Sequence, residues 1–310
     1  CAEQPLARII VSERCRAALG FATATGYDSS VRWAVGSPTE AALPGNEVVG
    51  IGGHGKEAQS FGSIDDLLVD RVLTTIGEDR TRPFFIHLNF HQPHAPTQAP
   101  KRWQGKTAGV YTDSLCAIDE RVGRILDRCA QADLAGRTLV VLTSDNGATQ
   151  AGSNAPFSGF KKSTMEGGMH VPAIAWWPGT VPAGVTCDRI AALCDLLPTA
   201  AALAGGKLPD YPIDGHDLSA LLRDPAAPAV REAWGYQPDG GPRGGSRFAA
   251  LRVGDLKVTD QGALFDLKVD PAEARDLAAE RVAERDALRQ RLKAEEAAIK
   301  RARWPEVQAP

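Results

Sequence analysis

Three short stretches of the sequence hold side chains suited to binding a metal ion or an anion. In the first, Asp145 and Asn146 stand between Ser144 and Gly147, directly after the apolar run at residues 138–143. A carboxylate beside a carboxamide offers two hard oxygen ligands of the kind that Ca²⁺ and Mg²⁺ prefer. The same residue types also build ordinary tight turns. Taken alone, the stretch therefore leaves a metal site and a plain turn both open.

The second stretch is HQPHAP, in which His91 and His94 stand close to two prolines. An imidazole titrates near neutral pH, so such a side chain can donate to an anionic ester oxygen or protonate a leaving group. The alternative is a loop histidine whose ring is satisfied by the backbone, and the residues alone leave both readings open.

The third stretch places Lys161 and Lys162 shortly before Gly167 and Gly168. A lysine is a compact point charge that suits a tetrahedral anion, and paired glycines let the backbone approach a ligand closely. The alternative is a pair of exposed lysines that water solvates.

The elements around these stretches predict an α/β layered domain, because strand and helix patterns alternate. Apolar runs predict buried strands at residues 84–90, 138–143 and 171–177. Helical spacing of apolar residues predicts helices over residues 63–76, 115–129 and 188–203. Asp65 and Asp66 suit the N-terminal turn of the first helix, and the third has to accommodate Pro198. Ligand sites in open α/β sheets gather in the loops at strand ends, where the three stretches are expected.

The chain beyond about residue 205 changes in texture and predicts a small second subdomain. Short β-like pieces are expected at residues 248–253 and 264–267, followed by a Glu/Arg/Ala-rich helix over residues 271–303. The predicted organisation is a core domain at residues 1–205 and, at residues 206–310, a subdomain of antiparallel strands with a terminal helix. Within the first 60 residues we expect mostly irregular structure and one short strand at residues 8–11.

Composition excludes several classes of protein. The 310 residues carry a net charge of only −3 with both signs interspersed, so no electrostatic footprint for nucleic acid is present. No apolar run reaches the length of a membrane span. The six cysteines have irregular spacing and no CxxC pair, which argues against zinc. Cys116 and Cys129 fall on the apolar stripe of a predicted helix, where packing is their expected role.

In their order and context, these motifs resemble the type I sulfatase family of the alkaline-phosphatase-like superfamily. PFFIHLNFHQPHAP is similar to the family segment in which a strand ends in a Pro-His pair, and TLVVLTSDNG to the strand that leads to its metal ligands. PFSGFKKSTMEGGMHVPAIAWWPG resembles the GGK, EGG, VP and WPG pattern, and LFDLKVDPAEARDLA the near-terminal signature. The resemblance spans about residues 60–280, and four linked motifs rarely coincide by chance.

The resemblance implies an alkaline-phosphatase-like mixed sheet flanked by helices, a small C-terminal α+β subdomain and hydrolysis of sulfate esters. It implies that Asp145 and Asn146 bind a divalent metal, Ca²⁺ or else Mg²⁺. It also implies that His94 and Lys161 contact the sulfate ester and take part in catalysis. Lys162 falls one place past the family lysine, and His91 has no assigned role. The implied partner is a sulfated small molecule or glycan, and the implied location is periplasmic or secreted.

The sequence departs from the family pattern at its beginning. The family carries there an Asp-Asp metal pair, a CxPSR-type motif whose Cys or Ser becomes formylglycine, and a GKWHLG stretch, and we do not find them. Residues 12–19 (SERCRAAL) mimic the nucleophile motif, but Arg14 and Cys15 occupy the expected Pro and Ser positions. We therefore expect an N-terminally incomplete chain that is poor at metal binding and catalysis alone, because Ca²⁺ takes about six to eight oxygens.

Two other functions stay open at this point. A pocket of histidine, lysine and metal accepts other tetrahedral anions, so a phosphate or phosphonate ester hydrolase of the same fold is the first alternative. The second is a non-catalytic homologue that binds sulfated glycans or a protein. The identity of the ester and the oligomeric state have no readable signal in the sequence.

Overall fold

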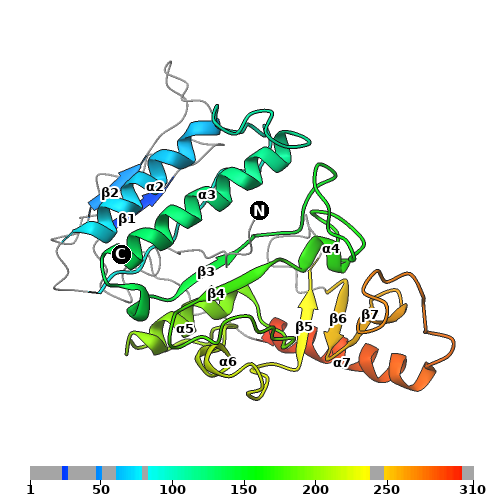
Figure 1. Cartoon of the computed structure of the whole chain (residues 1–310). Helices are drawn as coiled ribbons and strands as arrows, with labels where there is room; N and C mark the ends of the chain where they lie inside the picture. Colours follow the sequence, from blue (N-terminus) through cyan, green and yellow to red (C-terminus); the bar gives the residue numbers. More distant parts are fainter. Residues whose placement is uncertain (1–22, 27–46, 51–60, 79–82, 238–247, 302–310) are drawn as a thin grey trace. The chain divides into compact units, whose positions relative to one another are not determined.

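The computed structural model describes residues 23–26, 47–50, 61–78, 83–237 and 248–301 (Figure 1). The chain divides into two compact units. The first comprises residues 1–143 and 173–185, and the second comprises residues 144–172 and 186–310. The predicted strand at residues 8–11 and the SERCRAAL segment lie outside the described residues, and the predicted boundary near residue 205 stays a prediction.

Two long helices form the centre of the first unit. Helix α2 spans Phe61–Gly77 and helix α3 spans Val110–Gln131, and the two lie side by side (Figure 1). Their apolar stripes meet in a core that buries, among others, Val69, Val122 and Cys129. Both predicted helices are confirmed, because a stripe that recurs every three or four residues can be buried only on one face of a helix.

Short strands accompany these helices in the first unit. Strand β3 (Val140–Thr143) pairs antiparallel with β4 (Ala173–Trp176), so the predicted strands at residues 138–143 and 171–177 are confirmed with narrower bounds. The 3-10 turn η1 (Ala135–Arg137) leads into β3. Strands β1 (Thr23–Gly26) and β2 (Glu47–Gly50) pair in parallel, in a region where the sequence pattern predicted irregular structure.

The predicted strand at residues 84–90 is wrong, since only His87 in this segment forms a bridge. Its burial was predicted correctly: Leu88 is buried, while Phe84 and Phe90 pack against the core of α2 and α3. Apolar composition drives a segment into the core, whereas a strand also needs a neighbouring backbone in register.

An antiparallel sheet and a helix form the C-terminal part of the second unit. The strand order is β5 (Ala233–Tyr236), β6 (Ala250–Val253), β7 (Leu256–Thr259) and β8 (Leu264–Asp266). Helix α7 (Val282–Arg301) packs against β6 and β7 (Figure 1). The core there includes Leu251, Val258 and Leu292. The expected strands at residues 248–253 and 264–267 are confirmed, and the sequence pattern missed β5 and β7.

Two predicted helices begin later than expected. The C-terminal helix begins at Val282 rather than at residue 271, because the Asp276 carboxylate accepts the N–H groups of Leu264 and Ala278 and holds the preceding segment in turns. The helix predicted from residue 188 consists of η2 (Leu193–Asp195) and α5 (Leu196–Leu203). Pro198 then lies in the first turn of α5, where a missing N–H costs no helical hydrogen bond.

Two short helices complete the second unit, α4 (Glu166–Met169) and α6 (Ser219–Arg223). The longest described helices, α3 and α7, carry charged residues along their whole length. Within the described ranges, no helix combines the length and the apolar character needed to cross a membrane.

Candidate functional site

The turn after β3 and the lysine segment interlock within the second unit, in a stretch that we call the 144–170 loop. Backbone hydrogen bonds cross-link it: Gly147 N–H to Gly168 O at 3.0 Å, Lys161 N–H to Ala148 O at 3.0 Å, and Gly167 N–H to Ser158 O at 2.7 Å. The structure therefore brings Asp145, Asn146 and Lys161 into one loop cluster. The backbone segments that carry these three residues therefore belong to one hydrogen-bonded framework.

Asn154 adds a side-chain link inside the same loop. Its amide oxygen accepts the N–H of Ala148 at 2.7 Å, and its amide nitrogen donates to the carbonyls of Ala148 at 3.1 Å and Gly159 at 3.0 Å. Asn154 thus joins Ala148, which follows the Asp145–Gly147 turn, to Gly159, which lies two residues before Lys161. The sequence pattern missed it, because a polar residue in a Gly/Ser-rich loop carries no distinguishing signal.

Gly147 is required by a close approach of two backbones. A Cβ atom at this position would lie 1.8 Å from the carbonyl oxygen of Gly167 and 3.2 Å from Cα of Gly168. Both neighbours are backbone atoms and cannot rotate away. The glycine in the SDNG stretch therefore serves the contact with the EGG segment as well as the turn.

We expect the Gly147→Ala variant to lower the free energy of unfolding by about 1–3 kcal/mol, as overpacking does in other close-packed sites. Gly123 in α3 provides the control, because a Cβ there meets nothing within 4 Å and alanine favours a helix by up to about 1 kcal/mol. Urea unfolding curves measure both variants. A Gly147→Ala variant as stable as the unmodified protein, or more stable, would contradict the close approach of Gly147 to the backbone of Gly167 and Gly168.

The chemistry of Asp145 and Asn146 fits part of a Ca²⁺ or Mg²⁺ site. Asp145 is exposed and Asn146 is half-buried. The Asn146 amide nitrogen donates to the Gly147 carbonyl at 2.9 Å, so the amide oxygen is the atom left to coordinate a cation. Within the described residues, no three side chains of the His, Cys, Asp or Glu type gather around a possible ion. The pair offers two oxygen-bearing side chains, whereas Ca²⁺ takes about six to eight oxygens.

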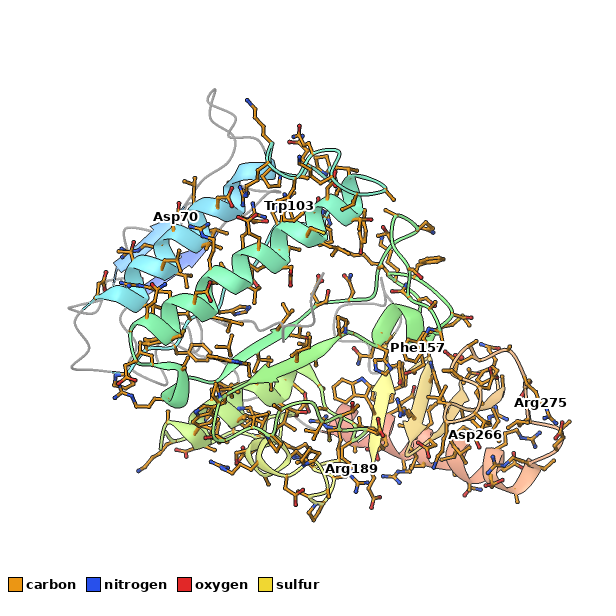
Figure 2. The ribbon with its side chains drawn as sticks, viewed as in Figure 1. Asp70, Trp103, Phe157, Arg189, Asp266 and Arg275 are labelled. Atoms are coloured by element: carbon orange, nitrogen blue, oxygen red, sulfur yellow. The ribbon has the colours of Figure 1, made fainter. Side chains whose placement is uncertain are left out.

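The two lysines of the loop differ in their surroundings. Lys161 is half-buried, and its N–H is bonded to the residue that follows the Asp145–Gly147 turn. Lys162 is exposed and has a backbone φ of 80°, a conformation that residues with a side chain seldom adopt. Phe157 (labelled in Figure 2) stacks on the His170 ring, with the two ring centroids 4.3 Å apart. Lys161 is therefore the less exposed of the two lysines, and its backbone belongs to the hydrogen-bonded framework of the loop.

Glu166 is the buried charged residue of this loop. Its carboxylate accepts the Tyr236 hydroxyl at 2.6 Å and the Lys257 ammonium at 3.1 Å. Burial raises the pKa of Glu166, but the hydrogen bond with His170 and the charge of Lys257 outweigh it and lower that pKa to about 2. Glu166 is therefore ionised at neutral pH. The burial of Tyr236 and the negative charge of Glu166 together raise the pKa of the Tyr236 hydroxyl.

His94 lies in the first unit, on the loop after residues 84–90, and its ring is exposed. Its Nδ1 atom is 2.6 Å from the carbonyl oxygen of Ala95. A carbonyl only accepts, so Nδ1 carries a proton and Nε2 is the atom left for a substrate. His91 differs, because burial and the neighbouring charge of His94 lower the pKa of its ring. The His91 ring is therefore protonated less readily than a free imidazole.

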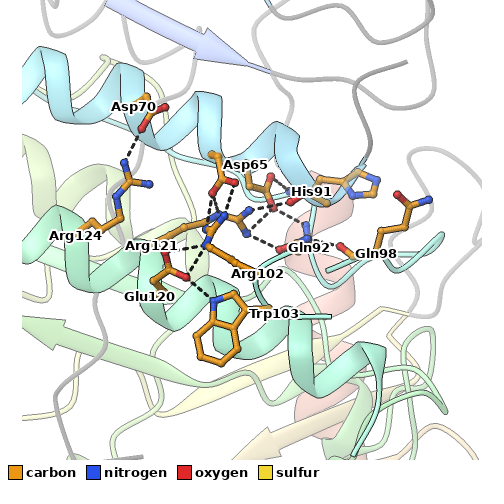
Figure 3. Close-up of polar contacts among 12 residues, drawn as sticks. Asp65, Asp70, His91, Gln92, Gln98, Arg102, Trp103, Glu120, Arg121 and Arg124 are labelled. Carbon is orange, nitrogen blue, oxygen red and sulfur yellow. Dashed lines mark hydrogen bonds and ion pairs between the residues drawn. The ribbon is translucent and has the colours of Figure 1, made fainter. Parts of the chain in front are cut away.

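The backbone of the histidine loop is held by a buried carboxylate (Figure 3). Asp65 accepts the N–H of His91 at 2.8 Å and the N–H of Gln92 at 3.1 Å. Arg121 contacts the same group, with Nη1 3.8 Å from Asp65 and hydrogen-bonded to the Gln92 side chain. The expectation that Asp65 and Asp66 serve the first turn of α2 is wrong, because α2 begins at Phe61 and places them one turn later.

Asp66 belongs to the same cluster and faces two guanidinium groups. Burial raises the pKa of Asp66, but hydrogen bonds from Arg102 and Arg121 lower it to about 2. The Arg121 Nε–H donates to Asp66 at 2.7 Å, and Arg102 makes two bonds of 2.8 Å to the same carboxylate. The cluster thus keeps an ionised carboxylate beside Arg121.

The predicted site residues fall into both units. Asp145, Asn146 and Lys161 lie together in the 144–170 loop of the second unit, whereas His94 belongs to the first. The meeting of His94 with the other three on one anion stays a prediction. The residues that mimic the nucleophile motif lie outside the described part of the chain.

Comparison with known proteins gives consistent matches. The model of the Sulfatase family matches residues 11–206. N-acetylgalactosamine-6-sulfatase of Sus scrofa is 44% identical over 144 residues, which cover 44% of this chain and 28% of that protein. Steryl-sulfatase of Mus musculus is 33% identical over 261 residues, which cover 71% of this chain and 42% of that protein. The crystal structure of PsFucS1 sulfatase from Pseudoalteromonas sp. has a TM-score of 0.70 at 22% identity, with 78% of this chain and 54% of that chain covered. The chain thus spans less than half the length of these two relatives.

Proposed function

Because the chain belongs to the sulfatase family and has its alkaline-phosphatase-like α/β fold, we propose that it acts in the hydrolysis of a sulfate ester. The observation that carries the proposal is the interlocked 144–170 loop. It holds an ammonium group and a pair of hard oxygen ligands on one framework, through the bonds of Lys161 to Ala148 and of Gly147 to Gly168. A sulfate group is a tetrahedral anion, which the ammonium group stabilises directly and which the oxygen ligands would stabilise only through the cation that they bind.

In this proposal each residue has one role. Lys161 binds the sulfate oxygens and stabilises the charge that develops on them. In its doubly protonated form the His94 ring donates from Nε2 to the ester oxygen or protonates the leaving group, while its Nδ1–H stays bonded to the Ala95 carbonyl. Asp145 and Asn146 would supply two ligands of a Ca²⁺ or Mg²⁺, and such an ion would contribute Lewis-acid polarisation of the sulfate group.

The formylglycine nucleophile of the family has no matching position in this chain. Residues 12–19 lack the proline and serine of the motif, so we assign no residue here to nucleophilic attack. The residues named above bind, orient and protonate the ester, and this is the part of the reaction that the chain's own side chains support.

The proposed substrate is a sulfated small molecule or glycan. The names of the two relatives, an N-acetylgalactosamine-6-sulfatase and a steryl-sulfatase, point to a sugar ester in one case and a sterol ester in the other. These matches therefore leave the alcohol part of the ester open. The shared element is the sulfate group, and the proposal is limited to it.

The test compares turnover of an aryl sulfate, an aryl phosphate diester and a phosphonate monoester, with Ca²⁺ present and after chelation. Because no nucleophile is assigned in this chain, we expect low turnover overall, with the highest kcat/KM for the aryl sulfate and its loss on chelation. Faster turnover of either phosphorus ester would overturn the sulfate assignment. Binding of a sulfated glycan without turnover of any ester would indicate a non-catalytic homologue.

A further inference from the structure

We propose that Lys257, on β7 of the C-terminal sheet, is a positioning residue for Lys161 and the Asp145–Asn146 turn. It acts through Glu166, at the start of α4. This inference rests on the proposed function for its chemical meaning, although the physical link that it describes can be measured without any substrate.

Lys257 is a buried ammonium group with an unusually complete set of partners. Its side chain is 1% exposed. Nζ lies 2.7 Å from the Thr164 carbonyl, 3.1 Å from Glu166, 3.0 Å from Glu273 and 4.2 Å from the centre of the Tyr236 ring. A buried charge is tolerated only when it is paired and hydrogen-bonded. Its position is therefore tightly defined by these groups.

Lys257 is linked to the backbone of the 144–170 loop in two ways, one direct and one through Glu273. Lys257 donates directly to the Thr164 carbonyl. Glu273, which Lys257 pairs with, accepts the backbone N–H of Glu166 at 2.6 Å. Contacts with main-chain atoms fix the path of the loop itself, in addition to joining side chains.

The loop then transmits this placement to the proposed site. Glu166 is followed by Gly167 and Gly168, whose backbones approach both halves of the loop. A Cβ on Gly168 would lie 2.3 Å from the Ser163 carbonyl oxygen and 2.6 Å from the Phe160 carbonyl oxygen. These two residues stand on either side of the Lys161–Lys162 pair. The Gly168 carbonyl accepts the N–H of Gly147. With so little clearance, a shift of α4 has to displace both the turn and the lysine segment.

The charges around Glu166 and Glu273 explain why Lys257 is the residue on which the position of α4 depends. Glu166 faces Lys257, Arg252 at 3.4 Å and His170 at 3.4 Å, and Glu273 is buried beside the same ammonium group. Without Lys257, two buried carboxylates lose a shared cation. Like charges in a poorly solvated site repel strongly, so we expect α4 to move away from the sheet.

The experiment replaces Lys257 by methionine in the full chain and follows hydrogen exchange of single amides by NMR. We expect the amides of Gly147, Lys161 and Gly167 to exchange at least about tenfold faster, while the β6 and β7 amides of Leu251 and Val258 change much less. The matched control is Lys268→Met, because Lys268 is exposed and lies just after β8. This control should leave all five amides as they are.

Two further variants keep the test decisive if Lys257→Met folds poorly. Lys257→Arg restores the charge and should recover most of the protection of the loop amides. Glu273→Gln keeps the shape but removes one ionised partner, and should loosen the same amides by a smaller factor. Unchanged protection of the loop amides in Lys257→Met and Glu273→Gln, or an equal increase of exchange throughout the second unit, would overturn the inference.

Titration with inorganic sulfate in the presence of Ca²⁺ links the inference to function. In the unmodified chain we expect sulfate to shift the Lys161 signals, and in Lys257→Met we expect the apparent Kd to rise at least about tenfold. Absence of a sulfate response in the unmodified chain would count against the proposed function. The exchange rates of the loop amides would then decide the positioning role separately.

Discussion

Replacing Lys161 by alanine is expected to lower kcat/KM for an aryl sulfate by about two to three orders of magnitude, the range found when a preorganised charge-stabilising group is removed. The physical reason is that Lys161 is half-buried and its backbone is bonded to Ala148. Its backbone therefore needs no further ordering before the side chain can stabilise developing negative charge. The measurement is steady-state turnover of an aryl sulfate over a range of concentrations.

The neighbouring lysine provides the matched control for this prediction. Lys162→Ala removes the same charge one residue later, from an exposed position with a different backbone conformation. Because water screens an exposed charge, we expect kcat/KM to stay within about threefold of the unmodified protein. Equal losses in both variants would mean that only the net charge of the loop matters, and the specific role of Lys161 would be wrong.

The second large effect is expected for Arg121, the buried cation of the first unit. Arg121 is fully buried, pairs with Asp65 and Asp66, and donates to the Gly62 carbonyl at 3.0 Å. Arg121→Met leaves two carboxylates without this partner. Breaking a buried ion pair from one side costs about 3–5 kcal/mol, and we expect a loss of this size in the free energy of unfolding of the first unit.

Native-state hydrogen exchange of the amides in α2 and α3 measures this free energy for the first unit by itself. The control is Arg124→Met on the same helix, whose partner Asp70 is exposed and lies 2.6 Å away. A surface pair of this kind contributes about 1 kcal/mol or less. A loss of unfolding free energy as small as this in Arg121→Met would refute the view that the buried ion pairs of Arg121 with Asp65 and Asp66 stabilise the first unit.

The same substitution should also loosen the histidine loop. Burial already raises the pKa of Asp65, and the charge of Arg121 opposes that rise. Without Arg121 the carboxyl group binds a proton more readily and holds the N–H groups of His91 and Gln92 less strongly. The amides of these two residues should therefore exchange faster in Arg121→Met than in Arg124→Met.

Local patterns predicted the elements whose shape depends on their own residues. The apolar stripes of α2 and α3 define their buried faces, since a helix satisfies its own backbone hydrogen bonds. Residues 84–90 show the limit, because the aromatic composition placed them in the core but could not supply a ladder partner. Pro198 shows a second limit, since its place in the first turn of α5 depends on how Asp195 and its neighbours end the preceding turn.

For the site, the sequence by itself determined which residues can do chemistry and where along the chain they stand: the Asp145–Asn146 pair after β3, Lys161 before the EGG segment, and His94 between prolines. Only the tertiary structure decided what holds them. Lys257 is 91 residues from Glu166, and Arg121 is 29 residues from Gln92. Such partners carry no mark in a local pattern, because the pairing energy of a buried charge arises only when folding removes water and brings distant groups together.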